Sequence, residues 1–317
     1  MVRLSALPQA KVERDESLAA HTRFGIGGPA DIYFETADAA TFAEALAIAQ
    51  HSGQPWCVIG DGSNLIVADE GYRGTVLRLR SNAIRVAGTR VDVDAGAGLQ
   101  ALVDFTVERG LRGMETMTGI PGCTGAAVYG NAGAYGHSIS ERIASVRFLD
   151  QGQVREFGNA ECGFHYRESI FKRNKHWIIL SATLDLTPAD SAELQATSSR
   201  ILDTRNRKYP PTMKCAGSIF KNFLYRELSP AVAAAVPATA VIEGKVPSAW
   251  FLEQVGAKGM RVGDIQVATY HANLIYNDGR GTARDVVTVV RELQRRVREK
   301  WSIEVEEEVQ YVGYFPV

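Results

Sequence analysis

Apolar and polar positions in the first eighty residues follow strand spacing in some segments and helix spacing in others. Short apolar runs predict buried strands at 32–35, 56–59 and 65–67. After the first run, Asp38 can cap a helix that Gly53 ends. One face of this helix carries Phe42, Ala45, Leu46 and Ala49. The order of strand, helix, strand, loop and strand predicts an α/β beginning to the fold.

The middle of the chain starts near residue 81 and is less regular. A strand is expected at 91–94, and the helix after it has an apolar side formed by Leu99, Leu102, Val103 and Val107. Further strands are expected at 146–148, 154–157 and 177–186. A helix over 191–208 is then stopped by Pro210 and Pro211. These elements favour an α+β fold.

The last part of the chain, from about 213 to 301, ends in an amphipathic helix. This helix is expected to start near Thr282, to carry Asp285 in its first turn, and to bury Val286, Val290, Leu293 and Val297. Beyond it, apolar positions alternate with polar ones at Ile303, Val305, Val309 and Tyr311. This alternation predicts a half-buried strand. The Ala-rich stretch 229–240 is interpreted as a surface insertion.

Composition excludes several classes of protein. The chain has 317 residues, 45% of them apolar, and 35 Lys and Arg against 36 Asp and Glu. This content excludes whole-chain disorder, and the balanced charge argues against nucleic acid or an anionic membrane as partner. Four cysteines without a CxxC pair indicate reduced thiols in the cytoplasm, and no secretory signal or membrane span is apparent. The six histidines lack metal-ligand spacing, so no metal site is expected.

Two glycine-rich segments can approach a ligand through their backbone. The turn GDGSN at 60–64 joins two expected strands, and seven glycines fall between 113 and 136. Successive backbone N–H groups in such turns can form a nest for phosphate, but the turn can equally be a tight structural one. The turn at 60–64 matches neither a dinucleotide fingerprint nor a phosphate-binding P-loop. Two nests in one α/β region suggest one diphosphate held by both.

Three other side chains are candidates for chemistry, each with a plainer interpretation. Ser218 follows Gly217 and can point into a cleft, although a lone serine is usually a turn hydroxyl. Arg167 can fork onto a carboxylate or simply pair with a local glutamate. Glu308 lies among four glutamates of the tail, where a solvated strand face is the usual explanation. The residue patterns alone leave these alternatives open.

Taken in order, these segments resemble the UDP-N-acetylenolpyruvoylglucosamine reductases, a family of bacterial flavoenzymes. The matching segments are 21–28, 60–64, 119–122, 131–136, 166–169, 217–222, 258–259 and 308–309 with Gly313. The resemblance extends from about residue 20 to residue 313. It implies an α+β protein, with a two-subdomain FAD-binding fold of the vanillyl-alcohol-oxidase (PCMH) type and a C-terminal α+β substrate domain.

The resemblance also implies a division of the chain into parts. The FAD-binding domain is expected at 20–187, with subdomains meeting near 81, and the substrate-binding domain at 201–301. A returning strand at 302–317 is expected to carry the catalytic glutamate. No tyrosine occurs between Tyr166 and Tyr209, so the chain is similar to the branch that lacks a tyrosine loop over the substrate. Gln310 stands where the family often has an arginine.

Cofactors and ligands follow from the same resemblance. It implies non-covalent FAD and NADPH as the hydride donor. The residues expected to hold FAD are Gly60, Asp61, Gly62, Ser63, Asn64, Ile120, Pro121, Gly122, Gly125, Asn131, Ala132 and Gly133. The residues expected at the UDP-sugar are Tyr166, Lys208, Asn222 and Gln254.

The implied activity is reduction of the enolpyruvyl group of a UDP-sugar to UDP-N-acetylmuramate for peptidoglycan, and hence for cell shape and division. Arg167 and Glu308 would polarise the substrate carboxylate, and Ser218 would protonate the carbon beside it. A cytoplasmic enzyme without an obligate protein partner is expected. The alternative is a flavin oxidase of the same fold that acts on another alcohol or sugar. A silent nucleotide-binding protein is disfavoured, because all three catalytic residues are present.

Overall fold

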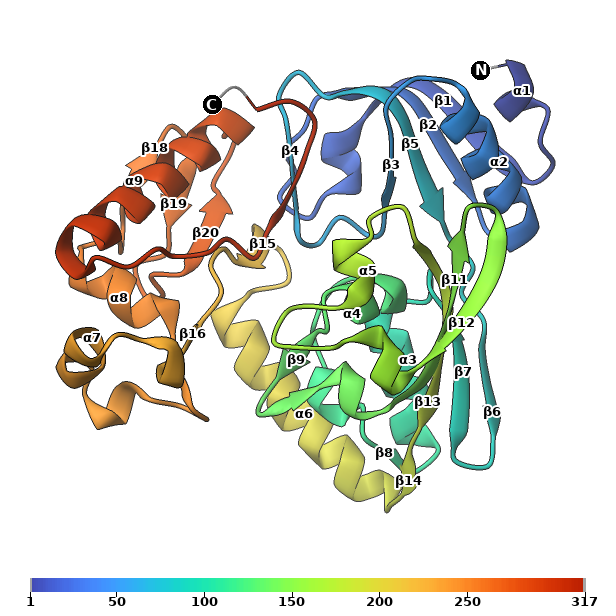
Figure 1. Ribbon diagram of the computed structural model, residues 1–317. Coiled ribbons are helices and arrows are strands. Elements are labelled where there is room, and N and C mark those ends of the chain that lie inside the picture. The colour runs from blue at the N-terminus through green and yellow to red at the C-terminus, as the bar shows by residue number, and fades with distance from the viewer. Residues whose placement is uncertain (1, 316–317) are drawn as a thin grey trace. The chain divides into compact units, whose positions relative to one another are not determined.

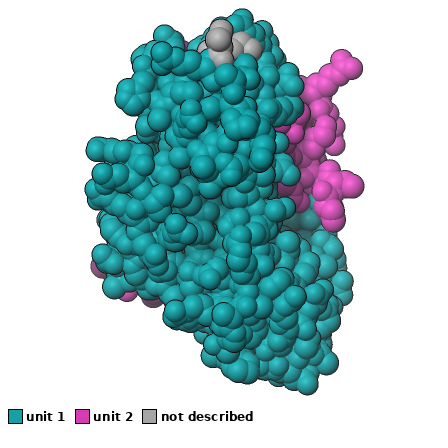
Figure 2. All heavy atoms as spheres, turned by 90° about the vertical axis from the view of Figure 1, so that its right-hand side faces the viewer, with its two compact units in different colours: residues 1–16, 30–61, 73–210 teal, residues 17–29, 62–72, 211–317 magenta. Residues whose placement is uncertain are grey.

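The computed structural model describes residues 2–315 and divides by its backbone contacts into two compact units. Unit 1 comprises the residues up to 16, then 30–61 and 73–210. Unit 2 comprises 17–29, 62–72 and the chain from 211 onward. Figure 2 shows the atoms of each unit in its own colour. Two short N-terminal segments therefore belong to the same compact unit as the C-terminal third of the chain.

The first layer of unit 1 is a four-stranded sheet in the order β1-β2-β5-β3, with two helices. Its elements are α1 (Val2–Ser5), β1 (Ala10–Ser17), β2 (Pro29–Thr36), α2 (Ala39–His51), β3 (Trp56–Ile59) and β5 (Tyr72–Leu79). The carboxylate of Asp38 accepts a hydrogen bond from the N–H of Thr41 at 2.7 Å and so caps α2. The predicted apolar face of α2 packs into a core with Phe34, Leu77 and Leu79.

A five-stranded antiparallel sheet in the order β12-β11-β13-β7-β6 forms the other half of unit 1 (Figure 1). Its strands are β6 (Ile84–Ala87), β7 (Arg90–Asp94), β11 (Ile143–Asp150), β12 (Gln153–Gly158) and β13 (Ile178–Asp185). The helices are α3 (Leu99–Glu108), α4 (Thr124–Tyr129), α5 (Ile170–Arg173) and α6 (Ser191–Lys208). Short strands are β8 (Leu111–Arg112), β9 (Gly133–Ala134), β10 (His137–Ser138) and β14 (Thr187–Pro188). A core of its own joins α3, α4 and α6 to this sheet, and the predicted helices and strands of this region are confirmed.

Unit 2 is built on the four-stranded sheet β15-β20-β19-β18 and helix α9 (Figure 1). Its strands are β4 (Leu65–Val67), β15 (Lys214–Ser218), β16 (Phe223–Leu224), β17 (Lys245–Val246), β18 (Arg261–Val262), β19 (Ile265–Val267), β20 (Leu274–Asn277) and β21 (Gln310–Val312). Its helices are α7 (Pro230–Ala235), α8 (Ser248–Gln254) and α9 (Ala283–Trp301). Thr282 and Asp285 form a capping box at the start of α9, as the sequence predicted.

The strand predicted over the tail is wrong in extent. Only β21 is a strand, and it pairs in parallel with the three residues of β4, which limits the ladder to three pairs. Upstream of β21, Val305 and Val309 are buried as the alternation predicts, but Glu307 makes only an isolated bridge with Phe220 and the segment does not form a strand. Glu308 therefore lies in an extended segment outside the strand, and Tyr311 is exposed.

The Ala-rich stretch is not only a surface feature. It forms α7 and a short 3₁₀ turn, and Ser229 caps α7 by accepting from the N–H of Val232. Val232 and Val236 pack into the core of unit 2, while most of their neighbours are exposed. These two buried valines could not be predicted from the composition, because single valines within an alanine run show little periodicity.

Candidate active site

Arg167 lies in a tight turn of unit 1. The N–H of Glu168 donates to the carbonyl oxygen of His165 at 3.1 Å, and the N–H of His165 donates to the carbonyl oxygen of Glu168 at 3.0 Å. Inside this turn Arg167 has a φ of 57°. Residues other than glycine are uncommon in this left-handed region, because Cβ crowds the backbone there. The surrounding contacts must therefore hold the backbone of Arg167 in a costly conformation.

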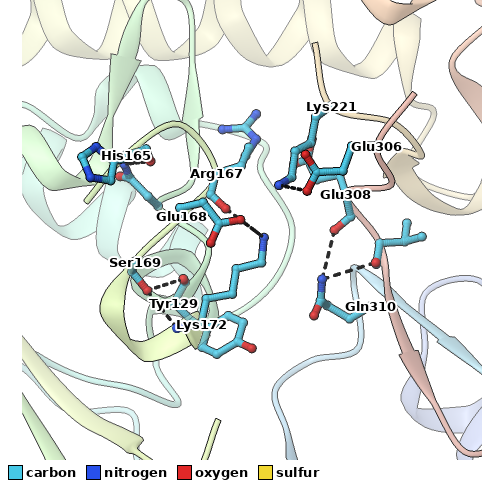
Figure 3. Close-up of polar contacts among 12 residues, drawn as sticks. Tyr129, His165, Arg167, Glu168, Ser169, Lys172, Lys221, Glu306, Glu308 and Gln310 are labelled. Carbon is cyan, nitrogen blue, oxygen red and sulfur yellow. Dashed lines mark hydrogen bonds and ion pairs between the residues drawn. The ribbon is translucent and has the colours of Figure 1, made fainter. Parts of the chain in front are cut away.

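Side chains on both sides of the turn supply those contacts, as Figure 3 shows for Lys172. The Lys172 ammonium donates to the carbonyl oxygen of Arg167 at 2.9 Å and pairs with the Glu168 carboxylate at 3.0 Å. The Asn131 amide donates to the carbonyl oxygen of His165 at 2.8 Å. The guanidinium of Arg167 itself donates to the carbonyl oxygen of Gly133 at 3.1 Å. The turn is thus fastened to the predicted FAD loop at 131–133.

Within unit 1, Gly60 at the start of the first glycine-rich loop lies against Cys123 of the second. A Cβ atom on Gly60 would come within 2.8 Å of the Cys123 sulfur, and a Cβ on Gly125 within 2.8 Å of the Ala95 side chain. Gly122 has a φ of 114°, which favours glycine. Burial raises the pKa of the Cys123 thiol, so this contact carries no negative charge at neutral pH. Close backbone and uncharged side chains fit the diphosphate of FAD, whose partners would be backbone N–H groups.

A charged network supports the first of these loops. The Arg78 guanidinium pairs with Asp61 of the loop at 2.6 Å and with Glu35 at 3.4 Å, and its side chain is only 11% exposed. The phenol of Tyr33 donates to Glu35 at 2.6 Å. Burial, together with Glu35, raises the pKa of Tyr33, so that it remains a donor. Arg78 offsets the charge of Asp61, which would otherwise oppose an anionic ligand.

In unit 2, Ser218 follows an irregularity in the pairing of β15 with β20. Cys215 lies opposite Tyr276 and Ser218 opposite Leu274, so β15 has one residue more than its partner over this interval. Gly217 takes up the extra residue with a φ of 76°. A bulge of this kind bends a strand and redirects the side chains beside it. It explains why a glycine precedes Ser218.

The segment after Ser218 pairs directly with the segment that carries Glu308. The N–H of Glu308 donates to the carbonyl oxygen of Ile219 at 2.7 Å, and the N–H of Lys221 donates to the carbonyl oxygen of Glu306 at 2.8 Å. The Lys221 ammonium also pairs with the Glu306 carboxylate (Figure 3). Two of the predicted catalytic residues, far apart in sequence, are therefore joined by main-chain pairing within unit 2.

Two asparagines predicted to hold FAD make side-chain hydrogen bonds to the protein. The amide of Asn64 donates to the carbonyl oxygen of Glu308 at 2.9 Å. The side chain of Asn131 donates to His165 and accepts from the N–H of Ser140 at 3.3 Å. Gln310 places its amide near the carbonyl oxygens of Glu308 and Val309, so it contacts main chain rather than an acidic side chain (Figure 3).

The predicted residues divide between the two units. Those in unit 1 are Gly60, Asp61, Ile120, Pro121, Gly122, Gly125, Asn131, Ala132, Gly133, Tyr166, Arg167 and Lys208. Those in unit 2 are Gly62, Ser63, Asn64, Ser218, Asn222, Gln254 and Glu308. The side chain of Asn222 accepts from the N–H of Ser248, at the start of α8, at 3.2 Å. Lys208 and Gln254 are both exposed and end the helices α6 and α8.

Lys172 and Arg78, which support the site, were not predicted from the sequence. Glu168 and Lys172 are four residues apart, a spacing that favours an ion pair on a helix, so this signal was available. No comparable signal points to Arg78, because its partners come from other strands and a loop. Within residues 2–315, no cluster of three or more His, Cys, Asp or Glu side chains can hold a metal ion. Over the same residues, no helix is long and apolar enough to cross a membrane.

Comparison with known families accounts for both halves of the chain. Residues 30–158 match the FAD binding domain, and residues 209–312 match the C-terminal domain of UDP-N-acetylenolpyruvoylglucosamine reductase. The first match confirms the predicted flavin-binding fold in the N-terminal half. The second covers the part of the chain in which the sequence predicted the substrate domain.

Individual relatives extend over nearly the whole chain. The UDP-N-acetylenolpyruvoylglucosamine reductase of Solibacter usitatus is 60% identical over 312 residues, which are 98% of this chain and 100% of that protein. That of Bacillus licheniformis is 33% identical over 98% of this chain and 97% of its own length. The crystal structure of the Thermus caldophilus reductase is similar with a TM-score of 0.76 at 29% identity, and covers 96% of this chain and 100% of that one.

Proposed function

The chain belongs to the UDP-N-acetylenolpyruvoylglucosamine reductase family, and from this premise we propose which of its residues carry the reaction. The protein is an FAD- and NADPH-dependent oxidoreductase of peptidoglycan precursor synthesis, which reduces the enolpyruvyl group of the UDP-sugar to give UDP-N-acetylmuramate. The alternative of a flavin oxidase acting on another alcohol or sugar is not favoured, because full-length relatives are named as reductases. The catalytic residues in this proposal are Arg167, Ser218 and Glu308.

One observation carries the assignment of Ser218 and Glu308. The segments that hold them pair through the N–H of Glu308 and the carbonyl oxygen of Ile219 at 2.7 Å. A chance resemblance of motifs gives no reason for two distant segments to meet at these residues. A reaction that polarises a carboxylate and protonates the neighbouring carbon needs both groups close to one substrate.

FAD, held by the two glycine loops, would supply the hydride chemistry for the far carbon of the enolpyruvyl double bond, with NADPH as the hydride donor. Negative charge then moves toward the substrate carboxylate. Arg167 offsets that charge with a planar guanidinium, which lowers the energy of the transition state more than that of the bound substrate. Its strained backbone indicates that the position of this group is maintained at a cost in stability.

Ser218 supplies the proton to the carbon next to the carboxylate. An alcohol is a weak acid, so the transfer depends on a strongly basic, carbanion-like acceptor and on close placement of Oγ. The bulge at Gly217 supports this role because it sets the direction of the Ser218 side chain. Glu308 acts with Arg167 on the carboxylate, and its segment is fixed by Asn64 and Ile219.

The remaining residues bind ligands in this proposal. The two glycine loops hold FAD, with Arg78 keeping the charge of Asp61 neutralised. Tyr166, Lys208, Asn222 and Gln254 contact the UDP-sugar. The functional domains are those expected from the sequence, 20–187, 201–301 and 302–317. We also propose that the enzyme works in the cytoplasm and needs no protein partner.

The two half-reactions test the role of Ser218 directly. In stopped flow, Ser218→Ala is expected to bind FAD and to be reduced by NADPH at a rate near that of the wild type. Reoxidation by the enolpyruvyl substrate should slow by at least about 10²-fold, the lower end of what a positioned acid contributes. Ser218→Cys should recover part of this rate, because a thiol can still give up a proton. If the alanine variant reoxidises normally, the proton comes from another group.

A further inference from the structure

Asn273 makes three hydrogen bonds to the two residues that follow Ser218. Its main-chain carbonyl oxygen accepts from the N–H of Ile219 at 3.2 Å. Its side-chain oxygen accepts from the N–H of Phe220 at 2.9 Å, and its side-chain amide donates to the carbonyl oxygen of Phe220 at 2.8 Å. One side chain thus satisfies both polar groups of the Phe220 backbone.

This arrangement is buried and depends on the amide group. Asn273 is 2% exposed and Phe220 1% exposed, so the bonds are shielded from bulk water. A carboxylate of the same shape offers no donor for the carbonyl oxygen of Phe220, and an alkyl side chain offers neither group. Buried backbone groups are almost always paired, which makes the amide difficult to replace here.

The position of Asn273 in the sheet connects it to the bulge. Asn273 immediately precedes β20, in which Leu274 lies opposite Ser218. Ser218 therefore has the bulge at Gly217 on one side and the peptide held by Asn273 on the other. The bulge leaves β15 with irregular pairing, so its own ladder fixes the register of Ser218 only weakly. The contacts of Asn273 restore a fixed position immediately after the bulge.

We propose that Asn273 is a positioning residue for the Ser218 hydroxyl, holding the backbone that directs it toward the carbon to be protonated. This inference rests on the proposed role of Ser218 as the proton donor. Asn273 acts through Ile219 and Phe220 and does not itself take part in proton transfer. A displacement of about 1 Å at a reacting group can cost about 10²-fold in rate, so loss of this hold should appear mainly in the proton-transfer step.

The test measures the two half-reactions of Asn273→Asp in the full-length enzyme loaded with FAD. Reduction by NADPH should stay within about twofold of the wild type, and reoxidation by the enolpyruvyl substrate should slow by at least about tenfold. Hydrogen–deuterium exchange should be faster in peptides covering 216–221. Asn273→Ser, whose short hydroxyl cannot reach both groups of Phe220, is the second variant if the aspartate form does not fold.

Asn277, the last residue of β20, offers a matched control. It is also buried, at 6% exposed, and its side chain accepts from the N–H groups of Gly279 and Gly281 at 3.1 and 3.0 Å. It lies opposite Lys214, at the other end of the pairing from Ser218. The Asn277 amide also donates to the carbonyl oxygen of Phe24 at 3.4 Å. Asn277→Asp loses this donor and buries a carboxylate, so it should lower the melting temperature while both half-reactions remain near wild type. If it slows reoxidation as much as Asn273→Asp does, the proposal is overturned.

Combination with Ser218→Ala separates the two claims. If Asn273 acts through Ser218, the double variant Ser218→Ala with Asn273→Asp reoxidises no more slowly than Ser218→Ala alone. If the two losses multiply, Asn273 acts elsewhere and the proposal fails. It also fails if Asn273→Asp slows both half-reactions equally or neither. Normal reoxidation of Ser218→Ala by itself would instead refute the proton-donor role on which the inference rests.

Discussion

The Arg167 turn of unit 1 and the Ser218 bulge of unit 2 each direct a proposed catalytic side chain through one left-handed backbone position. In the bulge the left-handed residue is Gly217, with a φ of 76°, and the catalytic candidate Ser218 does not adopt this conformation. In the turn the left-handed residue is Arg167, with a φ of 57°. A left-handed conformation costs a residue with a Cβ atom about 1–2 kcal/mol, and costs glycine almost nothing.

Whether the left-handed residue is also the catalytic one determines how stability and activity are linked in each region. At position 167 one residue carries both the strain and the function, so a substitution can remove the function and relieve the strain together. At 217 and 218 the two tasks are separate. Replacing the glycine introduces strain and disturbs the serine, whereas replacing the serine leaves the backbone unchanged. Stability and activity should therefore change in opposite directions at 167 and in the same direction at 217.

The largest effect is expected at Arg167. Arg167→Gly and Arg167→Ala should both lower kcat by about 10²-fold or more, because both remove the charge that stabilises the transition state. Only glycine relieves the left-handed strain, so Arg167→Gly should be more stable than Arg167→Ala by about 1 kcal/mol. Steady-state kinetics and urea unfolding of both variants measure the two quantities. At ordinary positions an alanine variant is usually more stable than a glycine variant, so the predicted order would indicate a left-handed backbone at position 167.

An alanine variant as stable as the glycine variant would contradict the proposed strain at position 167. The backbone at 167 would then relax out of the left-handed region once the guanidinium is lost, and the strain would be a consequence of the side-chain contacts. If kcat is unchanged and only KM rises, Arg167 binds the substrate without stabilising the transition state.

A smaller effect is expected at Gly217. Gly217→Ala should destabilise the protein by about 1–2 kcal/mol, because the left-handed backbone now carries a Cβ atom. Apart from its chain neighbours, no heavy atom of the described residues lies within 4 Å of that Cβ position, so the cost comes from backbone conformation and not from a clash. Reoxidation by the enolpyruvyl substrate should slow about tenfold as the bulge shifts. Reduction by NADPH should be unaffected.

Gly244 provides the control for this variant. It has a φ of 71°, and a Cβ atom there would likewise meet no heavy atom within 4 Å among residues 2–315 other than its chain neighbours. Gly244→Ala should lose a similar amount of stability and keep its reoxidation rate. Equal slowing in both variants would mean that lower stability alone, and not the direction of Ser218, explains the effect of Gly217→Ala.

The sequence could predict one of these two regions much better than the other. A glycine before Ser218 signals an unusual backbone, and the structure confirms it. An arginine in a left-handed position sends no such signal, because the conformation is held by Lys172 and Asn131 and not by its own preference. Periodicity gave α2 and α9 correctly, since each has a side-chain cap and a regular apolar face. The prolines at 210 and 211 indicated where α6 ends.

Contacts between distant segments could not be predicted from the sequence. The domains expected from the sequence are contiguous, whereas unit 2 also contains residues 17–29 and 62–72. The role of Asn64 at the carbonyl oxygen of Glu308 is invisible until the chain is folded. The tail was taken for one long strand because its polar and apolar residues alternate, although its partner β4 has only three residues. Local pattern predicts an element, but its length depends on its partner.

The smallest effect is expected at Lys172, because the two regions differ in the side chain that hydrogen-bonds each backbone. A neutral amide, Asn273, holds the Ser218 segment, whereas the ammonium of Lys172 holds the Arg167 turn with a side chain 15% exposed. Lys172→Met should lower kcat only a few-fold, because other contacts still hold the turn. It should also lower stability by about 1 kcal/mol, because the Glu168 carboxylate loses its partner.

Adding Glu168→Gln to Lys172→Met sharpens this prediction. Removing both partners of an ion pair is often nearly neutral, so the double variant should regain most of the lost stability. It should not regain kcat, since the bond from the Lys172 ammonium to the carbonyl oxygen of Arg167 is still missing. Thermal unfolding and kcat of the single and double variants separate the two contributions. If kcat returns together with stability, Lys172 serves only to neutralise Glu168, and the left-handed turn at Arg167 is held by its remaining contacts alone.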